Sequence, residues 1–171
     1  MQKSNPISLQ EYFLRPGYIY LSKLPTLIST VLGSCVAVAL WDKKREYGGM
    51  NHYLYPLTRN SKEATAQYGN VAVKALVRLF VEEGSNRKDL EAQIFGGAHL
   101  ADSPGEAVEI SHKNIDICRQ VLAMSKIPIV SEDVGGTKGR KVVYNSLTND
   151  VAVFRVEKLR ESDWYPYQGS R

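Results

Sequence analysis

Apolar and polar positions along this chain form short runs that predict strands at both ends of the sequence. Residues 17–22 and 26–31 are rich in β-branched and aromatic side chains and are separated by a Lys-Leu-Pro break, a pattern typical of strands. Residues 35–42 form an apolar run with the length and valine content of a buried strand. Residues 47–55 follow the charged turn 43–46 and complete a predicted hairpin.

Two longer segments have helical periodicity instead. In residues 70–83 apolar side chains recur three and four positions apart, which predicts an amphipathic helix that ends at Gly84. Its predicted apolar face consists of Ala72, Ala75, Leu76, Leu79 and Phe80. Residues 108–125 form a second predicted helix, which stops before Pro128. Its predicted apolar face consists of Ile110, Ile117, Cys118, Val121 and Leu122.

The remaining apolar runs, residues 90–95, 127–133, 141–146 and 151–157, read as further strands. The order of strands, helix, strand, helix and strands fits neither a doubly wound sheet nor an all-β protein. It predicts the α+β class, as a layered α/β sandwich with largely antiparallel sheets and two principal helices in a single domain.

The domain boundaries follow from the same pattern. We expect an N-terminal segment of residues 1–16, one domain over residues 17–160 and a loosely attached C-terminal tail of residues 161–171. The sequence shows no internal repeat or low-complexity tract.

Composition and charge narrow the function classes. The chain has 171 residues, a net charge of +4 and 43% hydrophobic residues, which is typical of a globular protein. No apolar run is long enough to span a bilayer and the start lacks a signal-peptide core, so we expect a cytoplasmic protein with no membrane insertion. The basic clusters 43–45 and 138–141 are short and lie in predicted turns, which favours solvated turns over a nucleic-acid surface.

The stretch Ser-Thr-Val-Leu-Gly-Ser-Cys at residues 29–35 holds the most informative candidate chemistry. A thiol directly after a Gly-Ser turn is a candidate nucleophile, and backbone N–H groups near Gly33 and Ser34 can form an oxyanion hole. A catalytic Cys35 is expected to have a lowered pKa and to react with iodoacetamide faster than Cys118. The alternative is that Cys35 is a small buried apolar residue, the commonest fate of a free cysteine.

His52 is the candidate base. A two-residue turn at Lys43 and Lys44 would pair His52 directly with Cys35, about 5 Å away on the same face of the hairpin. An imidazole there can take the thiol proton and return it to a leaving group. Lys-Lys is not a typical hairpin turn, so a register slip is the alternative, and a slip of one residue would move His52 to the other face.

A hydroxyl is the expected third member of such a site. Ser29 and Thr30 precede the cysteine by six and five residues and can orient the imidazole through its second nitrogen, or can simply cap a turn. His99 at a predicted strand end can line a cleft, whereas His112 reads as solvated.

No spacing of histidine, cysteine and carboxylate residues predicts a metal site, and the glycines near residue 136 match no nucleotide-binding motif. These glycines are typical of tight turns, and Arg140 is expected to pair with a carboxylate such as that of Asp133.

Taken in order, the segments STVLGSCVAVALWD, GGMNHYLYP, QYGNVAVKALV, IFGGAHL and EDVGGTKGRKV resemble the chemoreceptor glutamine deamidase family, known as CheD. The resemblance covers residues 17–156 and implies an α/β sandwich. It also implies hydrolysis of particular glutamine side chains on methyl-accepting chemotaxis receptors through a cysteine thioester, with Cys35 as nucleophile and His52 as base and with no cofactor. Some family members bind a CheC-type phosphatase.

This sequence departs from the family pattern at two positions. The family usually has a threonine six residues before the cysteine, where this chain has Ser29, so Ser29 is assigned as the third catalytic residue and Thr30 is its substitute. Ser111 stands where the family commonly has a glycine. Two other readings stay open, a non-catalytic adaptor that binds receptors or the phosphatase, and a cysteine peptidase with the same Cys-His pair.

Overall fold

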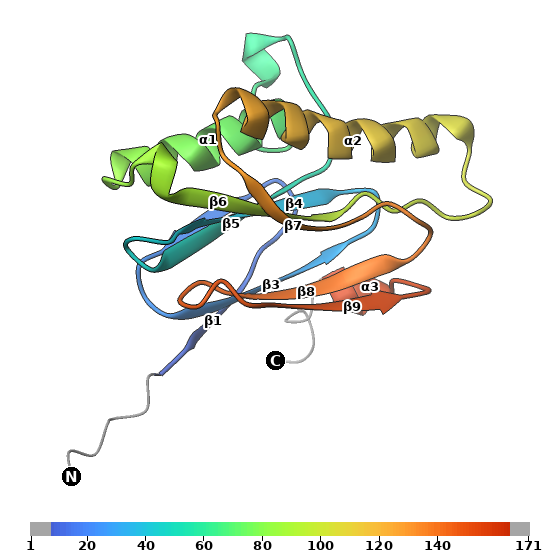
Figure 1. The fold of residues 1–171 in the computed structure, drawn as a ribbon. Helices are drawn as coiled ribbons and strands as arrows, with labels where there is room; N and C mark the ends of the chain where they lie inside the picture. Colours follow the sequence, from blue (N-terminus) through green and yellow to red (C-terminus); the bar gives the residue numbers. More distant parts are fainter. Residues whose placement is uncertain (1–7, 165–171) are drawn as a thin grey trace.

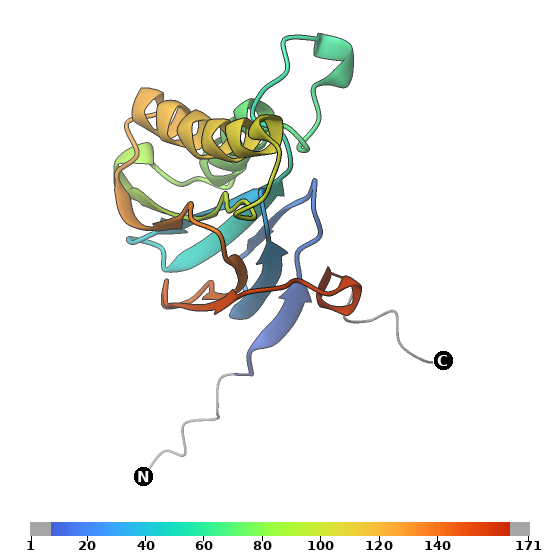
Figure 2. The same cartoon turned by 90° about the vertical axis from the view of Figure 1, so that its right-hand side faces the viewer.

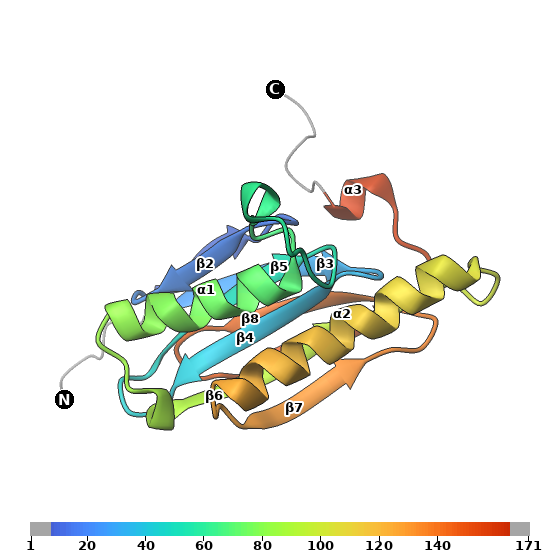
Figure 3. The same cartoon turned by 90° about the horizontal axis from the view of Figure 1, so that it is seen from above.

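The computed structural model describes residues 8–164, and the fold is built from three layers (Figure 1). Two long helices cover one face of a five-stranded sheet, and a four-stranded sheet covers its other face. Seen from above, α1 and α2 lie side by side across the five-stranded sheet (Figure 3). The side view in Figure 2 shows the same stack of helices and two sheets.

Strands and helices alternate in blocks along the chain. The strands are β1 (Gln10–Phe13), β2 (Ile19–Ser22), β3 (Thr26–Leu32), β4 (Val36–Asp42), β5 (Tyr47–Tyr53), β6 (Leu90–Gly96), β7 (Ile129–Val134), β8 (Gly139–Asn145) and β9 (Val151–Val156). The helices are η1 (Ser61–Glu63), α1 (Gly69–Glu82), η2 (Arg87–Asp89), α2 (Gly105–Met124) and α3 (Glu161–Trp164).

The two sheets interleave segments that are distant in the sequence. One sheet has the order β1-β3-β8-β9 and the other the order β2-β5-β4-β6-β7. Only β1 with β3 and β6 with β7 pair in parallel among the described strands, and the other neighbours are antiparallel. The predicted α+β class with largely antiparallel sheets and two principal helices is confirmed.

β4 lies at the centre of the stack, which explains its continuous apolar sequence. Val36, Val38 and Leu40 belong to the core beneath the helices. Ala37 and Ala39 alternate with them and belong to the core between the two sheets. Both faces of β4 are therefore buried, and its small inward residues keep the sheets close together.

Several element bounds differ from the sequence prediction. β1 lies within residues 1–16, which the sequence predicts to be a separate N-terminal segment. The sequence does not predict this strand, because its parallel pairing with β3 leaves no hairpin signal and its first two residues are exposed. α2 begins at Gly105, three residues earlier than predicted, directly after Pro104. The buried face of α1 includes Val73 and Val77, which the predicted face omitted.

Among the described residues, no helix combines the length and the apolar character needed to cross a membrane. The predicted tail falls partly outside the described residues, which end at Trp164.

Candidate active site

The candidate residues converge where β3 leads into β4 and where β5 ends. Cys35 directly precedes β4 and contributes to the core between the sheets, with a relative exposure of 9%. His52 is the penultimate residue of β5 and is fully buried. Thr30 lies on β3 in the facing sheet, so the site draws on both sheets.

The register of the hairpin differs from the predicted one by two residues. His52 pairs with Ala37, and β4 and β5 are joined by a four-residue turn after Asp42 instead of the two-residue turn expected from sequence. Because side chains alternate along a strand, a shift of two residues leaves His52 on the same face as Cys35. Cys35 is then a diagonal cross-strand neighbour of His52, at a separation that an aromatic side chain such as the imidazole can span.

Thr30 fixes the protonation pattern of His52. The Thr30 hydroxyl donates its single proton to the carbonyl oxygen of Leu14, at 2.8 Å, and its oxygen lies 2.7 Å from His52 Nδ1. Since that proton is already used, the oxygen must accept from Nδ1–H. The remaining ring nitrogen, Nε2, then carries the lone pair, and it is buried with no hydrogen-bond partner among the described residues.

Ser29 lies elsewhere. It is half-buried on β3, paired with Phe13 on one side and Val143 on the other, and strand alternation puts its side chain on the face opposite that of Thr30. The structure therefore brings Cys35, His52 and Thr30 to one face of the interior and leaves the Ser29 hydroxyl outside this group.

The loop that carries Cys35 is fixed by all three of its carbonyl groups. The Gly33 carbonyl accepts from the Ala98 N–H at 2.9 Å, and the Cys35 carbonyl accepts from the Gly97 N–H at 2.8 Å. The Ser34 carbonyl accepts from an amide side chain of α2. Within residues 8–164, no backbone carbonyl takes the N–H of Ser34 or Cys35, and the N–H of Cys35 meets only its own thiol. These two donors can therefore serve an oxyanion.

Gly96 is required by the close approach of this loop. It has φ of +105°, and a Cβ atom there would overlap the carbonyl oxygen of Cys35. A side chain at this position would push the thiol out of place, so the Gly-Gly pair at the end of β6 is part of the architecture of the site.

Burial sets the protonation states of the resting site. It raises the pKa of the Cys35 thiol to about 11, an effect only partly offset by the backbone N–H of Cys35. It also lowers the pKa of His52 to about 3, against a smaller opposing effect of the Leu14 carbonyl. Near neutral pH the pair is therefore a thiol beside a neutral imidazole. The lowered thiol pKa expected from sequence is wrong for this state.

We therefore expect Cys35 alkylation by iodoacetamide to accelerate about tenfold per pH unit from about pH 7 to 10, because only the thiolate reacts. The rate should show no plateau in that range, and peptide mapping at each pH measures it. Cys118 has a pKa also raised to about 11, but it is completely buried and should react more slowly. A rate that levels off below pH 7 would contradict the neutral pair.

Asn114 on α2 is the functional candidate to which the sequence reasoning gave no role. Its side-chain Nδ2 donates to the Ser34 carbonyl and to the Leu54 carbonyl, each at 2.9 Å. The backbone carbonyl of Asn114 accepts from the hydroxyl of Tyr53. One buried amide thus ties the loop that carries the thiol to the end of the strand that carries His52.

Replacing Asn114 with alanine should lower the catalytic rate about tenfold, with little change in KM. The substitution frees the loop that carries the thiol from the end of β5 and leaves two partly buried carbonyls unpaired. The unpaired carbonyls should also cost about 1–3 kcal/mol in the free energy of unfolding. Steady-state kinetics well below the melting temperature separate the two effects. Asn70→Ala is the matched control, since Asn70 makes similar bonds to Thr58. Equal kinetic losses in both variants would contradict the positioning role.

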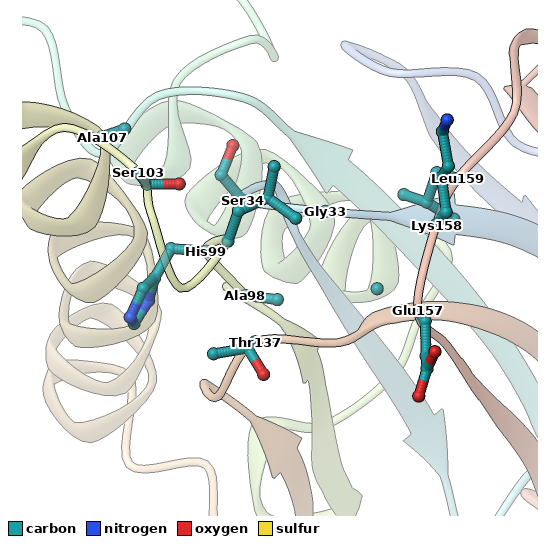
Figure 4. A pocket seen from close by; sticks show the side chains of 12 residues that line it. Gly33, Ser34, Ala98, His99, Ser103, Ala107, Thr137, Glu157, Lys158 and Leu159 are labelled. Atoms are coloured by element: carbon teal, nitrogen blue, oxygen red, sulfur yellow. The ribbon is translucent and has the colours of Figure 1, made fainter.

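A cleft of about 420 Å³ lies beside this loop and is lined by Gly33 and Ser34 (Figure 4). His99 lines it, as predicted. In Figure 4, His99 and Ser103 lie on one side of the cleft and Leu159 and Lys158 on the other, with Ser34 between them. The lining is largely apolar and stops at Ser34, one residue before the thiol.

Three other sequence predictions, on Arg140, Cys118 and His112, are confirmed around the site. Arg140 donates through Nε and a terminal nitrogen to Asp133, at 3.1 and 3.0 Å, and fixes the glycine turn by bonding the Gly135 and Lys138 carbonyls. Cys118 lies in the core and His112 is exposed. The described residues contain no group of three or more metal-ligating side chains that could hold a metal ion.

Comparison with known proteins agrees with the resemblance seen in the sequence. The family described as CheD chemotactic sensory transduction matches residues 56–155. A probable chemoreceptor glutamine deamidase CheD of Trichlorobacter lovleyi is 37% identical over 155 residues, covering 91% of this chain and 96% of the relative. A probable chemoreceptor glutamine deamidase of the same name from Sulfurimonas denitrificans is 37% identical over 150 residues, covering 87% and 96%. This chain belongs to the CheD family.

Proposed function

We propose that this protein hydrolyses the side-chain amide of particular glutamines on chemotaxis receptors, producing glutamate and ammonia through a thioester on Cys35. The observation that carries the proposal is the hydrogen bonding of His52, whose Nδ1 faces Thr30 and whose Nε2 is unpartnered. Relatives that align over most of the chain are named as probable chemoreceptor glutamine deamidases, which supports the receptor as substrate.

In the first half of the reaction, the Cys35 thiol transfers its proton to Nε2 of His52 as sulfur attacks the carbonyl carbon of the glutamine amide. The carbonyl oxygen becomes an oxyanion and accepts from the N–H groups of Ser34 and Cys35, each worth about 3 kcal/mol in comparable sites. The C–N bond then breaks, and the nitrogen takes the proton from the imidazolium and leaves as ammonia.

In the second half, water attacks the thioester carbon while Nε2 of His52 removes one of its protons. The C–S bond breaks, the thiolate recovers that proton and the side chain leaves as glutamate. The balance is one glutamine and one water consumed for one glutamate and one ammonia. Thr30 keeps its bond to Nδ1–H throughout, so it positions the base in both halves.

The high pKa of Cys35 implies that proton transfer accompanies attack rather than preceding it. A bound substrate brings the oxyanion donors into use, and the negative charge passes from sulfur to the carbonyl oxygen that they stabilise, so no free thiolate has to form first.

The proposal is tested by incubating the protein with the cytoplasmic fragment of a cognate receptor and measuring ammonia release and peptide masses. Each deamidated glutamine should gain about 1 mass unit, as hydrolysis of an amide through an acyl-enzyme requires. A receptor that binds tightly but never changes mass would contradict the proposal and indicate the adaptor reading. Binding of a CheC-type phosphatase stays a prediction, to be checked by copurification.

A further inference from the structure

The segment that follows the last strand lies along the cleft rather than away from it. We call residues 157–163 the C-terminal arm. Glu157, Lys158 and Leu159 line the cleft on the side opposite His99 (Figure 4). The family match ends at residue 155, so the arm lies beyond the matched region.

Leu159 anchors the arm against the loop that carries the thiol. A Cβ atom at Gly33 would meet Leu159 Cδ1 at 3.6 Å, and one at Gly139 would meet its Cγ at 2.9 Å. Leu159 therefore occupies the space left by two glycines and is half-buried there. One of those glycines is two residues before Cys35, so the arm borders the loop that carries the candidate nucleophile.

A second contact fixes the far end of the arm. Lys141 on β8 forms an ion pair with Asp163, with 2.5 Å between Nζ and Oδ1. The other carboxylate oxygen accepts from the Arg160 N–H at 2.8 Å. The arm is thus held at both ends, although part of it was predicted from sequence to be a loosely attached tail.

The cleft between the arm and the segment after β6 is suited to an apolar guest. Ala98, Leu100, Ala107 and Leu159 contribute apolar side chains to its lining. Glu157 also lines the cleft, but its carboxylate pairs with Lys138, with 3.6 Å between Oε1 and Nζ. Leu100 is 60% exposed. A substrate side chain placed here would cover apolar surface that is open to water in the free protein.

We propose that the C-terminal arm is a specificity-determining wall, and that the cleft holds an apolar side chain of the receptor segment that flanks the target glutamine. The inference rests on the proposed function. Consecutive residues of the substrate are about 3.8 Å apart, so a glutamine that reaches Cys35 brings its neighbours over Ser34 and into the cleft. Leu159 then discriminates between receptor segments by the side chain next to the target glutamine.

The test compares Leu159→Ala with wild type in deamidation of the receptor fragment. Removing the leucine side chain from the wall should raise KM about tenfold, because that much affinity corresponds to one buried apolar side chain. The value of kcat and the rate of Cys35 alkylation by iodoacetamide should stay within about twofold, since neither requires the wall. Leu24→Ala is the matched control, because Leu24 is 59% exposed at the opposite end of β3 and should leave KM unchanged.

A second variant covers the case in which Leu159→Ala displaces the whole arm. Asp163→Asn removes the ion pair with Lys141 but keeps the apolar lining. It should raise KM less than Leu159→Ala does, and the difference from wild type should shrink at high salt, where the ion pair is screened.

Binding separates this inference from the proposed function. In a Cys35→Ala background, the affinity for the receptor fragment should still fall about tenfold on adding Leu159→Ala, whether or not the native protein deamidates it. Equal affinities, or no binding of the fragment at all, would overturn the role of the arm. Failure of the wild-type protein to deamidate any receptor, with the affinity difference intact, would overturn only the proposed reaction.

Discussion

Cys35→Ala should reduce deamidation of a receptor fragment by at least about 10⁴-fold, and adding His52→Ala should cost almost nothing more. Attack by the thiol and proton uptake by the imidazole belong to one step in the proposed mechanism. Once either side chain is removed, the other no longer contributes to that step. His52→Ala alone should lose about 10³-fold or more, since the thiol then has no internal base. Ammonia release under single-turnover conditions, measured for both single variants and the double variant, tests this pattern.

Cys118→Ala is the matched control for that cycle. Cys118 is as deeply buried as any core residue and also has a raised pKa, but it lies beneath the helices, away from His52. Its replacement should cost stability similar to that lost in Cys35→Ala and leave the rate within about twofold. Losses for Cys35 and His52 that simply multiply in the double variant would contradict a coupled pair.

Thr30→Val should lower kcat about 100-fold, because valine keeps the shape of threonine but cannot accept the Nδ1–H proton that fixes the His52 tautomer. It also leaves the buried Leu14 carbonyl without its donor, which should cost about 1–3 kcal/mol in the free energy of unfolding. Kinetics and thermal melts of the same preparations separate the two losses.

The neighbouring hydroxyl provides the comparison for that experiment. Thr30→Ser keeps the oxygen and should retain most of the activity. Ser29→Ala should stay within about twofold of wild type, since Ser29 lies on the other face of β3. A large loss in Ser29→Ala combined with a mild one in Thr30→Val would reverse the assignment and restore Ser29 as the third residue.

The sequence predicts the hairpin and the common face of its two candidate catalytic residues, but not their register. The turn is four residues long because the Asp42 carboxylate accepts from the N–H groups of Lys44 and Arg45, at 2.9 and 3.0 Å, and because Glu46 adopts φ of +56°. An aspartate before a polar turn is a recognisable signal for this arrangement. The error of two residues preserves the face, which is why His52 remained a valid candidate.

The choice between Ser29 and Thr30 could not be made from the sequence. β3 is apolar on both faces, with Ile28 and Leu32 on one and Leu27 and Val31 on the other, so its pattern does not indicate which hydroxyl faces inward. The pairing of β3 with β8 in the four-stranded sheet decides between the two hydroxyls, because it sets which face of β3 meets β5.

The polar residues of α2 carry a signal for Asn114 in the sequence itself. Ser111 and Asn114 are polar residues on the face of α2 that also carries Ile115 and Cys118, and all four are buried. A buried amide on an apolar helix face must find partners, because an unpaired polar group in a core is costly. Its partners are the carbonyls of Ser34, in the loop that carries the thiol, and of Leu54, just after β5. No local pattern in the sequence identifies these partners.

The central claim is an acyl-enzyme formed by Cys35 from a glutamine side chain, and trapping that intermediate tests it most directly. With hydroxylamine added to protein and receptor fragment, the thioester should be diverted to a hydroxamate, seen in peptide spectra as a gain of about 16 mass units at the target glutamine instead of about 1. Neither product should form with Cys35→Ala. A gain of about 1 mass unit that hydroxylamine never diverts, or that persists in Cys35→Ala, would contradict the account.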